Sequence, residues 1–148
     1  MDNQALTRTY GNTDLPEGTP DRPLVTFALF AYNQENYIRE AVEGAFSQTY
    51  SPLEIILSDD CSSDRTFEIM EEMAREYQGP HLLKVRTASK NAGIGAHVNL
   101  VAGLSQGEII VFAAGDDVSL PHRTVELLMA FRNTPNSHFA CSDMGVVA

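Results

Sequence analysis

The sequence predicts an α/β domain with a mostly parallel sheet and helices on both of its faces. Short apolar runs of strand length alternate with stretches that carry apolar residues at helical spacing, which is the pattern of βαβ units. The first run, LVTFALFA over residues 24–31, is almost continuously apolar, as expected for a central strand covered on both faces. With 148 residues, 43% of them hydrophobic, the chain is long enough to bury one core.

The first half of the predicted domain runs strand, helix, strand, helix. After the first strand, a helix over residues 37–48 is indicated by apolar side chains at helical spacing, namely Ile38, Ala41, Val42, Ala45 and Phe46. The apolar run LEIILS predicts a strand over residues 53–58. Apolar residues at helical spacing then predict a second helix over residues 67–77.

The second half continues the alternation. HLLKVRT predicts a strand over residues 81–87, and a glycine-bearing loop leads to a short helix over residues 96–105. EIIVFAA predicts a strand over residues 108–114, and a proline opens a helix over residues 121–132. We expect a last strand over residues 137–142.

Residues 1–22 differ in composition from the rest of the chain. They are rich in Thr, Asn, Asp, Gly and Pro and have few apolar residues, so we expect a flexible leader there and one domain over residues 23–148. The leader lacks the apolar run of a signal peptide, and no stretch approaches the roughly 18 apolar residues of a membrane span. A cytoplasmic location is therefore expected.

Composition and motifs exclude several classes of function. The 20 Asp and Glu residues against 10 Lys and Arg give a formal charge of −10, which argues against a reader of duplex DNA or of anionic membranes. Cys61 and Cys141 belong to no CxxC or Cys/His cluster, so we expect two reduced thiols and no structural zinc. The sequence also shows no nucleophile elbow and no His spacing typical of a metal site.

Unusually polar loops follow the first, second and fourth predicted strands, at residues 31–35 (AYNQE), 59–64 (DDCSSD) and 115–117 (GDD). Ligands of open α/β sheets bind outside the carboxyl ends of the strands, so two acidic pairs are expected to converge there. Adjacent carboxylates are costly to keep ionised without a cation or hydrogen-bond donors. Mg²⁺ or Mn²⁺ would offset that cost and let an acidic domain accept a diphosphate, and a loop carboxylate can also bind a ribose hydroxyl or a base N–H.

Structural roles remain open for several of these residues. Ser63 and Asp64 precede a helix and are most simply helix caps. The acidic pair at residues 116–117 could serve a turn or cap a helix, and Asn33 is a common turn former. Glu35 is balanced between a solvated charge and a ligand contact.

The polar loops belong to three longer motifs that follow one another along the chain. They are VTFALFAYNQENYIREAVEGAFSQTYSPLEIILSDDCSSDRT, then NAGIGAHVN, then GEIIVFAAGDDVSLP. Together, from about Leu24 to Cys141, they resemble glycosyltransferase family 2. The resemblance implies a Rossmann-like GT-A fold whose first half binds a nucleoside-diphosphate sugar with Mg²⁺ or Mn²⁺.

The resemblance also implies roles for individual residues. The residues expected at the nucleotide sugar are Tyr32, Asn33, Glu35, Asp59, Asp60, Asn91, Gly93 and Asp116. Among them, Asp60 matches the acid that contacts the base, and Asp116 matches an acid that faces the nucleoside or the sugar. Asp117 matches the metal ligand.

Two positions depart from the family pattern. Ala114 and Gly115 stand where the family often has another Asp, so the metal site rests on the pair at residues 116–117. Residues 96–99 read AHVN where many members carry Ala-Arg-Asn, so an arginine contact to the nucleotide is not carried over.

The implied reaction is inverting transfer of the sugar to an acceptor hydroxyl of a glycan, lipid or protein, with no covalent intermediate. In the family, the general base is an acid in the second half of the catalytic domain, and no residue here matches it. Complete members are longer, so we expect this chain to be the donor-binding part of an enzyme, without the acceptor half. A non-catalytic nucleotide-sugar-binding module or an inactive fragment is the alternative. A phospho-accepting receiver domain fits poorly, because its acidic pair should follow the first strand.

Overall fold

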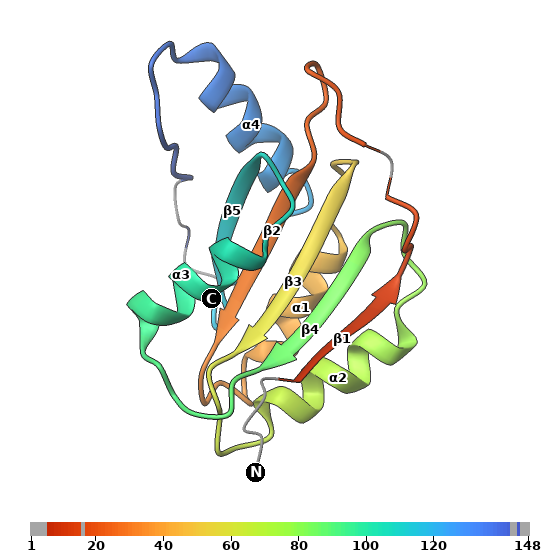
Figure 1. Cartoon of the computed structure of the whole chain (residues 1–148), viewed down its shortest axis with the longest axis vertical. Helices are drawn as coiled ribbons and strands as arrows, with labels where there is room; N and C mark the ends of the chain where they lie inside the picture. Colours follow the sequence, from red (N-terminus) through yellow and green to blue (C-terminus); the bar gives the residue numbers. More distant parts are fainter. Residues whose placement is uncertain (1–5, 16, 143–144, 146–148) are drawn as a thin grey trace.

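A computed structural model describes residues 6–15, 17–142 and 145. Within that part of the chain, five strands form one sheet in the order β1-β4-β3-β2-β5, with four helices packed on it (Figure 1). The strands are β1 (Leu6–Gly11), β2 (Val25–Ala31), β3 (Leu53–Asp59), β4 (Leu82–Thr87) and β5 (Ile109–Ala114). The helices are α1 (Ile38–Phe46), α2 (Thr66–Glu76), α3 (Ile94–Leu104) and α4 (Arg123–Asn133). Every predicted strand and helix between residues 24 and 133 is confirmed, with ends shifted by a few residues.

Strand β1 corrects the prediction of a flexible leader at residues 6–11. It pairs antiparallel with β4, from Leu6 opposite Thr87 to Gly11 opposite Leu82. Its sequence LTRTYG has almost no buried residue, because an edge strand lies against the sheet through its backbone and leaves its side chains in solvent. The short apolar run that predicts the other strands is therefore missing here.

The prediction of a strand over residues 137–142 is wrong, since these residues form no strand in the structure. Residues 138–142 instead line an apolar groove of about 770 Å³ between β5 and α4. The open edge of β5 is partly covered by a side chain, because the Arg123 guanidinium donates to the Phe112 carbonyl at 2.9 Å.

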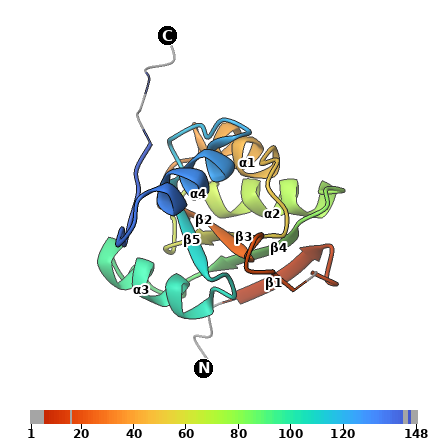
Figure 2. The same ribbon diagram turned by 90° about the horizontal axis from the view of Figure 1, so that it is seen from above.

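Helices lie on both faces of the sheet, as predicted. Helices α1, α2 and α4 cover one face, and α3 covers the other (Figure 2). Side chains of β2 alternate accordingly: Phe27 and Leu29 belong to the large core under the three helices, while Ala28 and Phe30 pack near Val101 of α3. This two-sided burial explains why β2 reads as a continuous apolar run.

A buried carboxylate fastens the end of α3 to the sheet. Glu54 on β3 is fully buried and accepts hydrogen bonds from Thr26 at 2.6 Å, from Lys84 at 2.5 Å and from the backbone N–H of Gln106 at 2.8 Å. Because the charge is paired and its oxygens are hydrogen-bonded, its burial is tolerated. The network fixes the loop between α3 and β5.

The topology gathers the functional loops at one edge. Strands β2, β3, β4 and β5 are mutually parallel, so their carboxyl ends meet at the lower edge of the sheet in Figure 1. The loops that begin at residues 32, 60, 88 and 115 all leave from this edge. None of the helices in the described part of the chain is long and apolar enough to cross a lipid bilayer.

We predict that the protein loses stability as the pH falls below neutrality, in part through His81. Burial lowers the pKa of His81 below its ordinary value, although the hydrogen bond with the Gln48 carbonyl opposes this. The folded state therefore binds fewer protons than the unfolded state in this range. The stabilisation is complete above the ordinary His pKa of about 6.5 and is lost as the pH falls through the lower folded value.

Urea unfolding at several pH values between 8 and 5 gives the free energy of unfolding as a function of pH, and the slope of that dependence measures the effect. We expect His81→Gln to lose less free energy of unfolding over this range than the wild type. His138→Gln, at an exposed position, is the matched control and should keep the wild-type slope. Equal slopes for all three proteins would show that the buried imidazole does not contribute.

Candidate functional site

The loops after β2 and β3 are joined into one unit by reciprocal hydrogen bonds. The Asn33 side-chain oxygen accepts from the Ser63 N–H at 2.8 Å, and the Asn33 N–H donates to the Ser62 hydroxyl at 2.9 Å. Glu35 accepts from the Arg65 N–H at 3.0 Å and donates its own N–H to Asp64 at 3.1 Å. Two of the predicted ligand residues therefore already have structural partners.

Asp64 has the local role that its position before a helix suggested. It accepts from the backbone N–H of Thr66 at 2.9 Å and from the Thr66 hydroxyl at 2.6 Å, at the start of α2. Burial acts to raise the pKa of Asp64, but these bonds and that from Glu35 lower it below the ordinary value. Asp64 thus stabilises both the start of α2 and the contact between the two loops.

Asp59 is a structural residue in this fold. Its side chain is almost fully buried and accepts from the Ser62 N–H at 3.0 Å, the Ser62 hydroxyl and the Thr87 hydroxyl at 2.6 Å. Three donors satisfy this buried charge. They connect the end of β3 to its own loop and to the end of β4.

Asp60 holds a third loop in place. Only 3% of the residue is exposed, and its two carboxylate oxygens accept from the N–H groups of Ala92 and Gly93, each at 2.9 Å. Gly93 has a φ of 78° and immediately precedes α3, so the carboxylate lies at the amino end of that helix. The Asn91 side chain adds a bond to the Asp60 carbonyl at 3.3 Å. The sequence analysis predicts that Asp60, Asn91 and Gly93 all lie at the nucleotide sugar, but it does not indicate that Asp60 binds the backbone of the loop at residues 91–93.

The acidic turn after β5 packs directly against the first loop. The Gly115 N–H donates to the Phe30 carbonyl at 2.8 Å, and a Cβ on Gly115 would lie 2.4 Å from the Gln34 side-chain oxygen and 3.0 Å from Ala31. This close approach is the physical reason for glycine at this position. Asp116 and Asp117 follow on the turn and are exposed.

Arg123, which the sequence did not indicate, anchors the far side of this turn. Besides its bond to Phe112, it donates to the Ser119 hydroxyl at 3.2 Å. Burial lowers the pKa of Arg123, and the nearby Asp117 carboxylate opposes that effect. A cation in the first turn of α4 therefore lies close to one of the two exposed acids.

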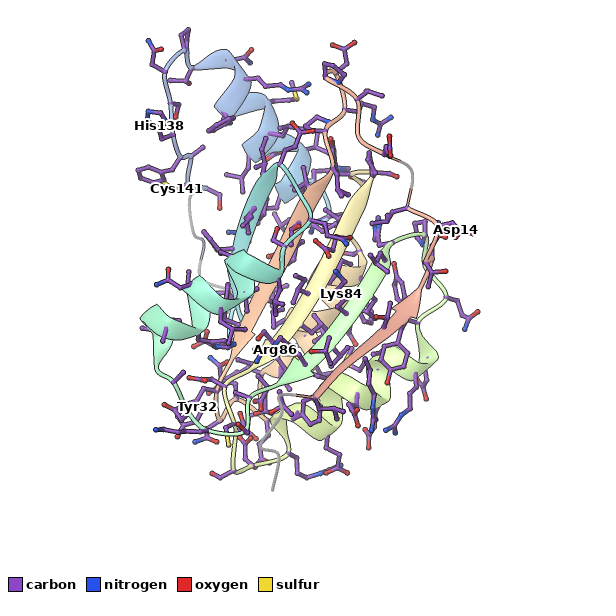
Figure 3. The ribbon with its side chains drawn as sticks, in the orientation of Figure 1. Asp14, Tyr32, Lys84, Arg86, His138 and Cys141 are labelled. Atoms are coloured by element: carbon purple, nitrogen blue, oxygen red, sulfur yellow. The ribbon has the colours of Figure 1, made fainter. Side chains whose placement is uncertain are left out.

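Tyr32 is the aromatic residue of the site. It is 49% exposed, and Figure 3 places it at the same edge of the sheet as the acidic loops. Asn91 is also exposed. The site therefore combines buried acids that shape the loops with an aromatic ring, an amide and two carboxylates that face solvent.

The exposed pair Asp116 and Asp117 suits a cation that keeps most of its ligands from elsewhere. Among the described residues, no group of three or more His, Cys, Asp or Glu side chains could hold a metal ion by itself. Mg²⁺ in nucleotide sites is typically held by one or two carboxylates together with substrate phosphates and waters. The two carboxylates fit a site of that kind, and they do not fit a metal site in which the protein supplies all of the ligands.

Comparisons with known proteins identify relatives that share this architecture. Residues 26–145 match the family model described as Glycosyl transferase family 2. The putative glycosyltransferase EpsE of Bacillus subtilis is 33% identical over 109 residues, which are 74% of this chain and 38% of EpsE.

Two solved structures resemble the fold. The structure of S. aureus TarS 1-349 in complex with UDP-GlcNAc superposes with a TM-score of 0.61 at 28% identity, covering 74% of this chain and 31% of that one. The mannosyltransferase PcManGT from Pyrobaculum calidifontis, in complex with GDP-Man and Mn²⁺, has a TM-score of 0.63 at 24% identity, covering 76% and 33%. The chain thus spans less than two fifths of the length of EpsE and of these two proteins.

We predict that Asp59 and Asp116 differ sharply in their effect on stability. Asp59→Ala leaves three donors without a buried acceptor, so we expect the free energy of unfolding to fall by about 2–4 kcal/mol. Asp116→Ala removes an exposed side chain and should change it by no more than about 0.5 kcal/mol. Chemical denaturation of the two variants checks both values, and a neutral effect of Asp59→Ala would contradict the structural role of that residue.

Proposed function

Because the chain belongs to glycosyl transferase family 2 and has the GT-A fold, we propose that it forms the part of a glycosyltransferase that binds a nucleoside-diphosphate sugar. The observation that carries the proposal is the meeting of four loops at the carboxyl edge of the sheet, with exposed Tyr32, Asp116 and Asp117 at that edge. Ligands of open α/β sheets bind at such an edge. TarS, which is similar over most of this chain, was solved with UDP-GlcNAc.

The nucleoside is proposed to lie between Tyr32 and the loop at residues 91–93. An exposed tyrosine ring offers a face on which a base can stack. The Asp60 carboxylate has acceptor capacity beyond the two amides that it already binds, which a base N–H would use. Asn33 and Glu35 are proposed to border the nucleotide through the backbone of the loop that they fix.

The diphosphate is proposed to lie toward the turn after β5, with Asp117 as a ligand of Mg²⁺ or Mn²⁺ and Asp116 facing the nucleoside or the sugar. When bound, such an ion would neutralise charge that grows on the diphosphate as the sugar bond breaks. The chain has a formal charge of −10, so an anionic donor needs a cation to approach two exposed carboxylates. PcManGT, which shares the fold, was solved with Mn²⁺.

The proposed reaction is inverting transfer of the sugar to the hydroxyl of a glycan, lipid or protein acceptor. Donor binding, orientation of the diphosphate and stabilisation of its charge fall to the residues described above. Deprotonation of the acceptor hydroxyl requires a general base within hydrogen-bond reach, and we assign that role to no residue of this chain.

Calorimetric titration with UDP, GDP and dTDP, each with and without Mn²⁺, tests the proposal. We expect one nucleotide to bind in a metal-dependent manner, and Asp117→Asn to weaken that binding at least about tenfold, because a charged ligand of the ion is lost. Asp14→Asn is the matched control, since Asp14 is exposed and lies far from Tyr32 (Figure 3). If none of the three nucleotides binds under either condition, the proposed site is wrong.

Tyr32 provides a second test that separates stacking from hydrogen bonding. We expect Tyr32→Ala to weaken nucleotide binding by roughly tenfold to a hundredfold, since stacking of a base on an aromatic ring contributes about 1–3 kcal/mol. Tyr32→Phe should bind as the wild type does, because the ring is kept. Tyr37→Ala removes an exposed tyrosine from the same segment and is the matched control. Equal affinities for the two alanine variants would exclude Tyr32 from the site.

A further inference from the structure

Strand β4 carries two cations, Lys84 and Arg86, on the face of the sheet that α3 covers. They alternate along the strand with Leu83 and Val85, which belong to the core under the other three helices. Each cation donates to a side chain of the neighbouring strand β3. Of the two, Arg86 lies closer to the edge of the sheet that carries Tyr32 (Figure 3).

Arg86 is the more deeply buried of the two cations. Only 1% of the residue is exposed. Its Nη1 donates at 2.6 Å to the hydroxyl of Ser58, which lies opposite it in the strand register. Within the part of the chain that the structure describes, its Nε and Nη2 are buried without a hydrogen-bond partner. Burial of a charged group with unused donors costs free energy, so the contact with Ser58 requires an explanation.

The hydroxyl of Ser58 is shared between Arg86 and His97. Its oxygen also lies 2.6 Å from Nε2 of His97, and Ser58 is fully buried. A guanidinium can only donate, so the Ser58 oxygen accepts from Arg86. Among the described residues the hydroxyl has no third partner, and a buried hydroxyl proton needs an acceptor. The two bonds therefore run in one direction, from Arg86 to Ser58 and from Ser58 to His97.

This direction assigns the protonation state of the His97 ring. A ring nitrogen that accepts a hydrogen bond carries no proton, so the ring is neutral and has its proton on Nδ1. The surroundings agree, because burial lowers the pKa of His97, and the positive charge of Arg86 acts with burial against the opposing charge of Asp60. The ring also packs edge-on against Phe30 of β2, with the ring centroids 5.1 Å apart.

His97 connects this series of hydrogen bonds to the loop that precedes α3. Its backbone N–H donates to the Gly93 carbonyl at 2.9 Å, at the start of the helix. The Gly93 N–H is bound in turn by the Asp60 carboxylate. Ser58 and Asp60 are two residues apart at the end of β3. One strand end therefore holds the start of α3 at two points, through the His97 ring and through the Gly93 backbone.

We propose that Arg86 is a positioning residue that donates to Ser58, directs the Ser58 proton onto Nε2 of His97, and thereby anchors the start of α3 and the loop at residues 91–93. A charged donor at the beginning of a series of hydrogen bonds strengthens the bond that follows it. The inference rests on the proposed function only for one consequence, which is that nucleotide binding depends on this loop.

Lys84 supplies a matched control for Arg86. It is a cation on the same strand and the same face, but its partner is Glu54, which binds the Gln106 N–H just beyond the carboxyl end of α3. Lys84→Met therefore breaks a buried ion pair near the other end of the helix. It leaves Arg86, Ser58 and His97 in place, so a loss of stability alone is separated from a loss of the hydrogen-bond series.

Long-range ¹H–¹⁵N NMR of the histidine rings in the ligand-free protein tests the proposal, because it reports which ring nitrogen carries the proton. We expect the proton of His97 on Nδ1 in the wild type and in Lys84→Met. In Arg86→Met the Ser58 hydroxyl is free to accept instead, so His97 should become a mixture of the two tautomers. Arg86→Lys keeps a charged donor and should restore the wild-type state.

Two results would overturn the inference. The first is a wild-type His97 that carries its proton on Nε2, or on both nitrogens, at neutral pH. The second is an Arg86→Met protein in which the protonation of His97 is the same as in the wild type. The first result comes from the wild-type protein alone, so the inference can fail whether or not the variants fold.

Nucleotide affinity of the same variants separates this inference from the proposed function. If the wild type binds a nucleotide, Arg86→Met should weaken that binding by about tenfold and Lys84→Met should not, because only the first removes the anchor of the loop. Equal affinities of the two variants would contradict the positioning role. If the wild type binds no nucleotide but His97 has its proton on Nδ1 as expected, the hydrogen-bond series holds and the proposed function fails.

Discussion

The carboxylate of Asp60 is the contact on which the candidate site depends. It directly follows β3 and accepts two backbone amides from the loop that precedes α3. Without that contact, the loop at residues 91–93 would lose two hydrogen bonds from its backbone and keep the longer one from the Asn91 side chain to the Asp60 carbonyl. The parallel sheet brings the strand ends together, and the buried acids then fix the loops in a defined shape.

The acids of this edge divide into two groups with different physical roles. Asp59, Asp60 and Asp64 are wholly or partly withdrawn from solvent and are satisfied by hydrogen-bond donors, so their charge serves the fold. Asp116 and Asp117 are exposed on a turn, and their charge is available to a ligand or ion. The buried acids are already satisfied by hydrogen-bond donors, so only the exposed pair needs an added cation. An acidic domain can therefore accept the anionic donor that we propose.

The sequence predicted the central elements of the fold because their physical signal is strong. Strands buried on both faces, such as β2 and β3, are continuous apolar runs, and the helices between them show regular spacing. Strand β1 lacks this signal since its side chains are mostly exposed, and residues 138–142 line a groove without forming a strand. The pattern of apolar residues along a segment indicates whether its side chains are buried. It does not indicate whether the backbone of that segment pairs with a neighbouring strand.

The candidate site was predicted in position but not in detail. The polar loops do leave from one edge, as the rule for parallel sheets requires. The structural use of Asp59 and the anchoring roles of Arg86 and Arg123 depend on partners between 4 and 28 residues away in sequence, and no local motif carries that information. The two basic residues inside the strand HLLKVRT, Lys84 and Arg86, are the one hint that the sequence offered.

The most direct test of the account is a map of amide NMR shifts on addition of the nucleotide, using Mg²⁺ as the ion to avoid paramagnetic broadening. We expect the affected amides to cluster in the loops at residues 32–35, 60–64, 91–93 and 115–117, with little change elsewhere. Shifts confined to the groove between β5 and α4, or spread evenly over the surface, would contradict the claim that the carboxyl edge of the sheet is the donor site.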